Sequence, residues 1–159
     1  MAVESAEFRR ILGHWTTGVA VVSTVTEDGA PRGLTASAVA SVSLQPPLVL
    51  VCVERRADTH EYISSAGFFS ISILPQSAER IARRFAGDAT DAKFDGIAYH
   101  SEATGAPVLD DALAWIDCRV RFVHDGGDHT IFVGEVLAGD AREGEPLVYY
   151  RSGFNRLLP

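Results

Sequence analysis

The stretch from Arg32 to Val53 constrains the fold most, because a proline pair separates a hydroxyl-rich run from an unbroken apolar one. Pro46 and Pro47 cannot donate a backbone N–H, so they interrupt strand pairing, whereas the run Leu48–Val53 suits a fully buried strand. The small residues of GLTASAVAS leave backbone N–H groups and hydroxyls accessible to a flat ligand with polar edges. We therefore interpret this stretch as two strands that help to hold a cofactor.

Short apolar runs separated by turn residues fill most of the chain, a pattern typical of strands joined in hairpins. Asp28–Gly29 predicts a turn between the first two strands, and the connection His124–His129 contains a pair of glycines that suit another turn. The expected strands cover residues 19–26, 34–44, 48–53, 68–74, 113–123, 130–137 and 146–150.

Three helices are expected beside these strands. The first has Ser5 as a candidate N-cap and Gly13 near its end, and we expect it to form a lid on the core. Its apolar residues at helical spacing are Phe8, Ile11, Leu12 and Trp15. The second is capped by Asp58 and ends near Gly67, and the third begins at Pro75 and runs through Phe85.

Because strands outnumber helices and follow one another in hairpins, the expected fold class is mainly β, a mostly antiparallel β-barrel with flanking helices. A chain of 159 residues that are 47% hydrophobic is long enough for one domain, taken as residues 1–159. Neither a Rossmann glycine motif nor a P-loop occurs. The apolar runs are too short to cross a bilayer and the N-terminal segment lacks a signal-peptide core, so we expect a cytoplasmic protein with no membrane partner.

The net charge of −7, from 14 basic and 21 acidic residues, makes nucleic acid an unsuitable partner. Clustered arginines can still form a local phosphate site, although each taken alone is better explained as solvated surface charge. The candidates are Arg55, Arg56, Arg83, Arg84, Arg151 and Arg156. Cys52 and Cys118 lie in apolar runs, where we expect them to behave as small buried hydrophobes.

The connection HDGGDH places two imidazoles and two carboxylates close together, but a plain turn explains it better than a metal site. We therefore expect no bound metal. His129 differs from the other histidines because it stands where the turn enters the apolar strand TIFVGEV, so its ring is a candidate donor at the mouth of the barrel. The hydroxyls of Thr35, Ser37, Ser41 and Ser43 suit ligand binding and solvent exposure equally well. The segment Tyr149–Tyr150–Arg151 fits either core packing of its aromatic rings or contact with an anionic, planar ligand.

Four segments in order, GLTASAVASVSLQPPLVLVCV, ARRFAG with DAKFDGI, LAWIDCRV and GGDHTIFVGEV, resemble the flavin reductase family of two-component flavin-dependent monooxygenases. The resemblance runs from about Phe8 to Arg151. It implies an FMN-binding split β-barrel that forms a homodimer, uses NADH or NADPH to reduce FMN or FAD, and passes reduced flavin to a separate monooxygenase component.

The resemblance also implies the residues that contact each ligand. The isoalloxazine edge is expected at Gly33, Leu34, Thr35, Ala36, Ser37 and Ser41, chiefly through backbone N–H groups. The ribityl chain and phosphate are expected at Val53, Glu54, Arg55, Arg56, Ala57, Asp58 and Thr59, with Arg55 and Thr59 as polar contacts. The flavin phosphate or adenylate is expected near Arg84, Phe85, Ala86, Lys93 and Phe94. The nicotinamide is expected at His129, the candidate catalytic residue, with Tyr150 and Arg151 nearby.

The implied activity is that of an NAD(P)H:flavin oxidoreductase, in which a hydride passes from the nicotinamide to the flavin. Its main alternative is a split-barrel protein that binds flavin or haem without turnover, and a second is an oxidase that retains its flavin, similar to pyridoxamine-phosphate oxidases. Two departures from the family pattern are Ala57, where many relatives have serine, and Ala38–Val39, where many have a Ser-Phe pair. The lost serine hydroxyl leaves both FMN and FAD open as the flavin.

Overall fold

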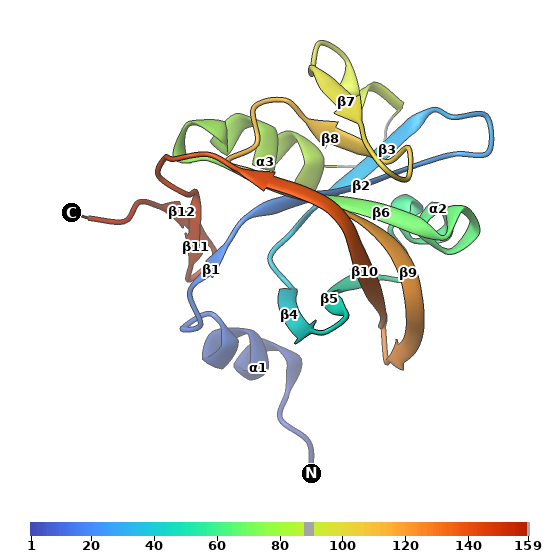
Figure 1. Ribbon diagram of the computed structural model, residues 1–159. Coiled ribbons are helices and arrows are strands. Elements are labelled where there is room, and N and C mark those ends of the chain that lie inside the picture. The colour runs from blue at the N-terminus through green and yellow to red at the C-terminus, as the bar shows by residue number, and fades with distance from the viewer. Residues whose placement is uncertain (88–90, 159) are drawn as a thin grey trace.

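The computed structural model describes residues 1–87 and 91–158 of the chain, and its main element is a curled antiparallel sheet of seven strands (Figure 1). The strand order is β3-β2-β6-β9-β10-β5-β4. These strands are β2 (Ala20–Val25), β3 (Pro31–Ala36), β4 (Val39–Leu44), β5 (Pro47–Glu54), β6 (Phe68–Ile73), β9 (Ala114–Gly126) and β10 (His129–Ala141). The mainly β fold with flanking helices is therefore confirmed.

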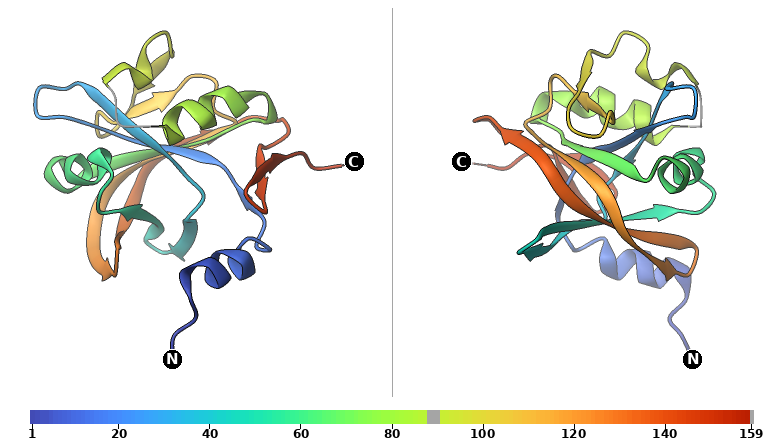
Figure 2. Two further views of the ribbon diagram at one scale, coloured as in Figure 1. Left: turned by 180° about the vertical axis from the view of Figure 1, so that it is seen from behind. Right: turned by 45° about the vertical axis from the view of Figure 1, so that its right-hand side comes forward.

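Shorter strands form two small sheets beside the main one, and helices flank it (Figure 2). One small sheet contains β1 (Thr17–Gly18), β11 (Val148–Tyr150) and β12 (Gly153–Asn155), and the other contains β7 (Tyr99–Ser101) and β8 (Pro107–Leu109). The helices are α1 (Ser5–Leu12), α2 (Asp58–Ala66), α3 (Glu79–Ala86) and the 3-10 helices Gln76–Ala78 and Asp91–Phe94. In the described part of the chain, no helix is both long enough and apolar enough to span a membrane.

The single strand expected over residues 34–44 is wrong, because the structure divides it between the two edges of the main sheet. β3 pairs with β2, whereas β4 pairs with β5, and the chain crosses between them at Ser37 and Ala38. The backbone N–H of Cys52 donates to the Ala38 carbonyl at 3.0 Å, which ties the crossing to β5. This crossing links the two edge strands of the curled sheet, β3 and β4, which do not pair with each other.

The lid expected of α1 is also wrong, because none of its residues is buried. Glu4, rather than Ser5, precedes the helix, and it makes no side-chain capping bond. The helix lies beside the barrel, next to the N-terminus (Figure 1). Ala57, rather than Asp58, occupies the N-cap of α2, while Gly67 ends that helix at a φ of 75°, which is the left-handed conformation that glycine favours.

Hydrophobic residues pack on both faces of the main sheet. In β2, Val22 lies in a cluster inside the barrel with Val53 and Phe132, whereas Val21 faces the opposite cluster with Phe85 of α3. Burial on both faces explains why Ala20, Val21 and Val22, at the start of β2, are apolar at consecutive rather than alternating positions. It also fixes α3 against the sheet, and the C-terminal end of α3 then forms one wall of the candidate site.

Candidate functional site

A cavity of about 490 Å³, which we call the β3–β5 cavity, opens where the chain crosses from β3 to β4. The end of β5, the start of α2, the end of α3 and the start of β10 form its other walls. The lining residues are Leu34, Thr35, Ala36, Ser37, Ala38, Cys52, Glu54, Arg56, Ala57, Asp58, Phe85, Ala86, Gly87, Lys93 and His129. This volume lies within the range typical of small-molecule and cofactor sites.

The crossing itself gives the cavity a wall of small side chains. Ala36 ends β3 and Val39 begins β4, so Ser37 and Ala38 lie outside regular strand pairing. The Thr35 hydroxyl donates to the Ala82 carbonyl of α3 at 2.6 Å, which holds the end of β3 against that helix. The backbone here is therefore fixed in position and covered only by small side chains, an arrangement that admits a flat ligand.

Lys93 provides a buried positive charge in the cavity wall. Its side chain comes from the 3-10 helix Asp91–Phe94, the residue is only 7% exposed, and its Nζ donates to the Phe85 carbonyl at 3.2 Å. An ammonium group has three hydrogens to donate, and a buried charge with only a neutral acceptor is costly. Among the described residues no carboxylate forms an ion pair with Lys93. The arrangement therefore suits an anionic group of a ligand.

His129 is the first residue of β10 and lies opposite Glu54 of β5. Its Nδ1 is 2.8 Å from Oδ1 of Asp128, and its side chain is 42% exposed. The same hydrogen bond lowers the pKa of the Asp128 carboxyl, and the charge of His129 adds to the effect. With Nδ1 engaged, Nε2 is the ring nitrogen left to contact a ligand in the cavity.

Arg55, which directly follows β5, stabilises the turn before His129. The Arg55 guanidinium donates to the Gly127 carbonyl at 3.0 Å and to Oδ1 of Asp125 at 2.6 Å. Gly127 has a φ of 76°, as expected for a hairpin turn. Strand β9 continues to Gly126, however, so the turn is shorter than the expected 124–129 connection. Arg55 thus supports the turn that carries His129 and does not line the cavity.

The structure brings together about half of the residues expected from the sequence. Those that line the β3–β5 cavity are Leu34, Thr35, Ala36, Ser37, Glu54, Arg56, Ala57, Asp58, Phe85, Ala86, Lys93 and His129. The others lie behind or beside it, and they are Gly33, Ser41, Val53, Arg55, Thr59, Arg84, Phe94, Tyr150 and Arg151.

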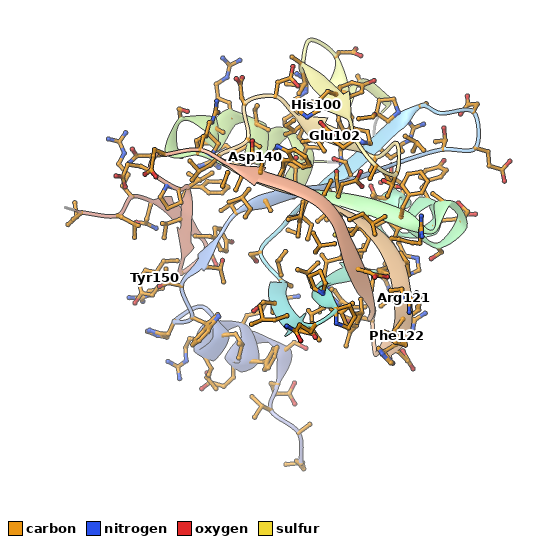
Figure 3. All side chains as sticks on the ribbon, in the orientation of Figure 1. His100, Glu102, Arg121, Phe122, Asp140 and Tyr150 are labelled. Carbon is orange, nitrogen blue, oxygen red and sulfur yellow. The ribbon has the colours of Figure 1, made fainter. Side chains whose placement is uncertain are left out.

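Several of these outlying residues support the walls. Val53 and Thr59 are fully buried, and a Cβ added at Gly33 would lie 3.0 Å from the Phe85 ring. The Arg84 guanidinium donates to the Ala92 carbonyl at 2.6 Å. Tyr150 lies on the outer side of the C-terminal strands (Figure 3), with its ring 6.2 Å from that of His14.

Sequence reasoning missed Ala38, Cys52 and Gly87 as lining residues. Cys52 was expected to be buried, but it is only partly so, and its neighbours in β5, Val51 and Val53, are fully buried. Because side chains alternate along a strand, burial of these two valines turns Cys52 to the opposite face, where the cavity lies. Partial burial raises the pKa of its thiol.

A second cavity of about 830 Å³, which we call the α1 cavity, adjoins the first. It lies between α1, the crossing and the C-terminal strands, and Arg151 is one of its lining residues. The two cavities share Ala36, Ser37, Ala38 and Cys52. A ligand at the crossing can therefore extend into either space.

The sequence of this chain is similar to those of known proteins along almost its whole length. Residues 12–158 match the family described as flavin reductase like domain. The reductase component of the 4-nitrophenol 4-monooxygenase/4-nitrocatechol 2-monooxygenase of Rhodococcus opacus is 43% identical over 99% of this chain and 83% of that protein. The FMN reductase (NADH) SmoA of Agrobacterium fabrum is 40% identical over 96% of this chain and 86% of that protein.

A solved structure extends the likeness to three dimensions. The NADH:FAD oxidoreductase of Streptomyces globisporus, in complex with NAD and FAD fragments, superposes with a TM-score of 0.92 at 36% identity, covering 100% of this chain and 98% of that chain. The crossing, the cavity walls and the His129 hairpin thus belong to a fold shared along the whole chain, and the chain belongs to the flavin reductase family.

Proposed function

We propose that this protein is an NAD(P)H:flavin oxidoreductase that reduces FMN or FAD with NADH or NADPH and supplies the reduced flavin to a partner monooxygenase. One observation carries the proposal: a single cavity combines the small-residue crossing at Ser37 and Ala38, the buried ammonium of Lys93 and the imidazole of His129. The names of relatives, including a monooxygenase reductase component and an FMN reductase (NADH), support the same activity.

The described residues fit a flavin nucleotide. A flat tricyclic ring suits the crossing, where Ala36, Ser37 and Ala38 keep side-chain bulk low. The phosphate suits Lys93, and Arg56, which precedes α2 in the same lining, can add a second positive charge. Arg55 and Thr59, which the family resemblance implies as polar contacts, are already engaged with Asp125 and Asp58.

When bound, the nicotinamide supplies the hydride and the flavin accepts it. The protein's own contribution is to position the two rings and to place dipoles where negative charge develops. Backbone N–H groups of the crossing would provide the dipoles, and Nε2 of His129 would orient the nicotinamide rather than transfer a proton. Asp128 holds the His129 ring through the 2.8 Å contact at Nδ1.

The test is oxidation of NADH in air, followed by its absorbance, with FMN, FAD or riboflavin added in turn. We expect turnover that depends on the added flavin. Binding of a flavin without NADH oxidation would instead identify a binding protein, the alternative without turnover. If the protein supplies a partner, the flavin must also exchange, so a flavin that stays bound through gel filtration at low concentration contradicts the supply role.

We also propose a homodimer. Large apolar side chains are exposed on β4, where Val42 is 49% and Leu44 is 90% exposed, and Ile11 of α1 is 48% exposed. Figure 1 places α1 and β4 at the same end of the molecule. Exposed apolar patches of this kind mark association surfaces, and β4 is also an edge of the main sheet.

The same proposal places one domain, residues 1–159, in the cytoplasm. Two packed clusters share the main sheet, which supports one folding unit. Cys52 and Cys118 are both free thiols, which is the usual state in a reducing compartment, and the cytoplasm also supplies the reduced nicotinamide nucleotide.

A further inference from the structure

The α1 cavity has a charge pattern that the proposed flavin site does not explain. Two arginines, Arg9 of α1 and Arg151 at the turn between β11 and β12, are the charged residues in its lining. No Asp or Glu lines it, although the chain as a whole carries 21 acidic and 14 basic residues. The cavity therefore offers an unbalanced positive charge in an acidic protein.

Neither guanidinium is neutralised by a neighbour. Within the described residues, no ion pair or side-chain hydrogen bond involves Arg9 or Arg151. Arg10, the next residue on α1, differs because its guanidinium pairs with Glu7 at 2.7 Å and lies outside the lining. Phe8, Arg9 and Leu12 all line the cavity, which fits one face of the helix.

A backbone hydrogen bond connects the two segments that carry the arginines. The N–H of Arg151 donates to the carbonyl of Gly13, the C-cap residue of α1, at 3.0 Å. Arg151 and Ser152 have φ values of 47° and 62°, a left-handed conformation that residues other than glycine rarely adopt. Such conformations persist only where the surrounding structure holds them, and they cluster at ligand sites.

The remaining lining suits the uncharged part of the same ligand. Leu12, Trp15 and Tyr149 contribute apolar and aromatic surface. Thr17 also lines the cavity, and its Oγ1 is shielded from solvent without a hydrogen-bond partner in the described part of the chain. The wall at Ser37, Ala38 and Cys52 is common to the β3–β5 cavity, so a ligand here can reach the ring held at the crossing.

We propose that Arg9 and Arg151 bind the pyrophosphate of the nicotinamide dinucleotide, so that α1 forms part of the hydride donor's binding site. This inference rests on the proposed function and names which part of the donor the α1 cavity recognises. A planar guanidinium matches phosphate oxygens in a bidentate manner, and two such groups suit a diphosphate. Arg9 and Arg151 would then position the donor without contacting the reacting ring.

The test compares two hydride donors in the full-length protein with saturating FMN. NADH carries the pyrophosphate, whereas reduced nicotinamide riboside carries the same dihydropyridine without any phosphate. In R9Q and R151Q, we expect kcat/KM for NADH to fall at least about tenfold, mainly through KM, with the value for the riboside unchanged. ADP-ribose, which contains the pyrophosphate but not the nicotinamide, should inhibit these variants less than the parent protein.

R10Q is the matched control, because Arg10 lies on the same helix and pairs with Glu7. It should keep the parent preference for NADH over the riboside, and R151K should keep more of it than R151Q. If R9Q and R151Q both reduce flavin normally and keep the parent preference for NADH over the riboside, the pyrophosphate site is wrong. The proposed function would still stand. If the parent protein oxidises neither donor, the proposed function itself fails.

Discussion

Single residues of the proposed site differ in whether they contact a ligand or hold a neighbour. His129 lines the β3–β5 cavity, whereas Asp128 contacts its Nδ1 and is not in the lining. We predict that His129→Ala raises the KM for NADH or slows flavin reduction, while the affinity for flavin changes little. Stopped-flow reduction at several NADH concentrations, with a separate flavin titration, measures both quantities. An unchanged rate and KM would remove His129 from the mechanism.

Asp128→Asn is expected to have a smaller effect of the same kind, because an amide can still hold the imidazole but without a negative charge. The pH profile separates positioning from a merely structural role. The pKa of the Asp128 carboxyl is lowered, chiefly by its hydrogen bond with His129, so the carboxylate form persists as the pH falls. We predict that kcat/KM for NADH differs between the parent and the variant above the pKa of this carboxyl and becomes equal below it. Identical pH profiles of kcat/KM for NADH would exclude the positioning role.

His60 supplies a pH dependence of stability. Its Nε2 is 2.7 Å from Oγ1 of Thr130, and burial, followed by the positive charge of Arg55, lowers its pKa. The unfolded chain therefore binds the proton more readily, so the contribution of His60 is present above its unfolded pKa and is lost as the pH falls toward its folded pKa. We predict a smaller loss of unfolding free energy between about pH 7 and about pH 5 in His60→Gln. Urea titrations measure this loss, and His124→Gln, at an exposed position, should retain the parent slope.

At the scale of elements, a glycine, which has no Cβ, allows strands β9 and β10 to pack closely against β6. Gly134 lies at a register shift between β9 and β10, and a Cβ added there would be 2.7 Å from Cζ of Phe69 and 2.8 Å from Cβ of Cys118. We predict that Gly134→Ala lowers the unfolding free energy by about 1–3 kcal/mol, because both neighbours are buried. Gly18→Ala is the control, since nothing lies within 4 Å of its added Cβ. Equal urea midpoints for the two variants would contradict this packing argument.

Local sequence predicted the hairpins well because their turns are encoded locally. Asp28–Gly29 and the glycine pair after Asp125 both lie at the turns of antiparallel pairs. The division of residues 34–44 was not predictable in this way, because the alternation continues through the crossing and only the partner strands, β2 and β5, distinguish its two halves. β8 was missed for a similar reason: the N–H of Leu109 donates to the buried hydroxyl of Ser72, which lies far away in sequence.

The same distinction applies to the candidate site. The crossing and His129 were found from neighbouring residues, whereas the contrast between Arg55 and Arg56 depends on the tertiary fold. The Arg55 guanidinium is hydrogen-bonded to the β9–β10 turn, whereas Arg56 lines the cavity. Lys93 was assigned from the family resemblance, but its burial against the Phe85 carbonyl required the structure. Sequence patterns thus located the site, and packing decided which side chains line it.

On the scale of the whole molecule, both cavities adjoin the segment where the chain crosses from one edge of the main sheet to the other. One short segment, residues 36–38, therefore contributes to the ring-binding wall and to the space that leads toward α1. The consequence is a donor site and an acceptor site built around a common backbone, which suits direct transfer between two bound rings.

The proposed homodimer gives the last prediction. Leu44, 90% exposed on the edge strand β4, would be buried between two copies, so Leu44→Lys should place a charge in an apolar contact. We expect the parent protein to sediment at twice the chain mass of 17.1 kDa and the variant to shift toward a single chain at micromolar concentration. Glu27→Lys, an exposed change in the β2–β3 turn, controls for added charge and should leave the mass unchanged. A parent protein that sediments as one chain at all concentrations would contradict the dimer, and a Leu44→Lys dimer of parent strength would exclude β4 as its surface.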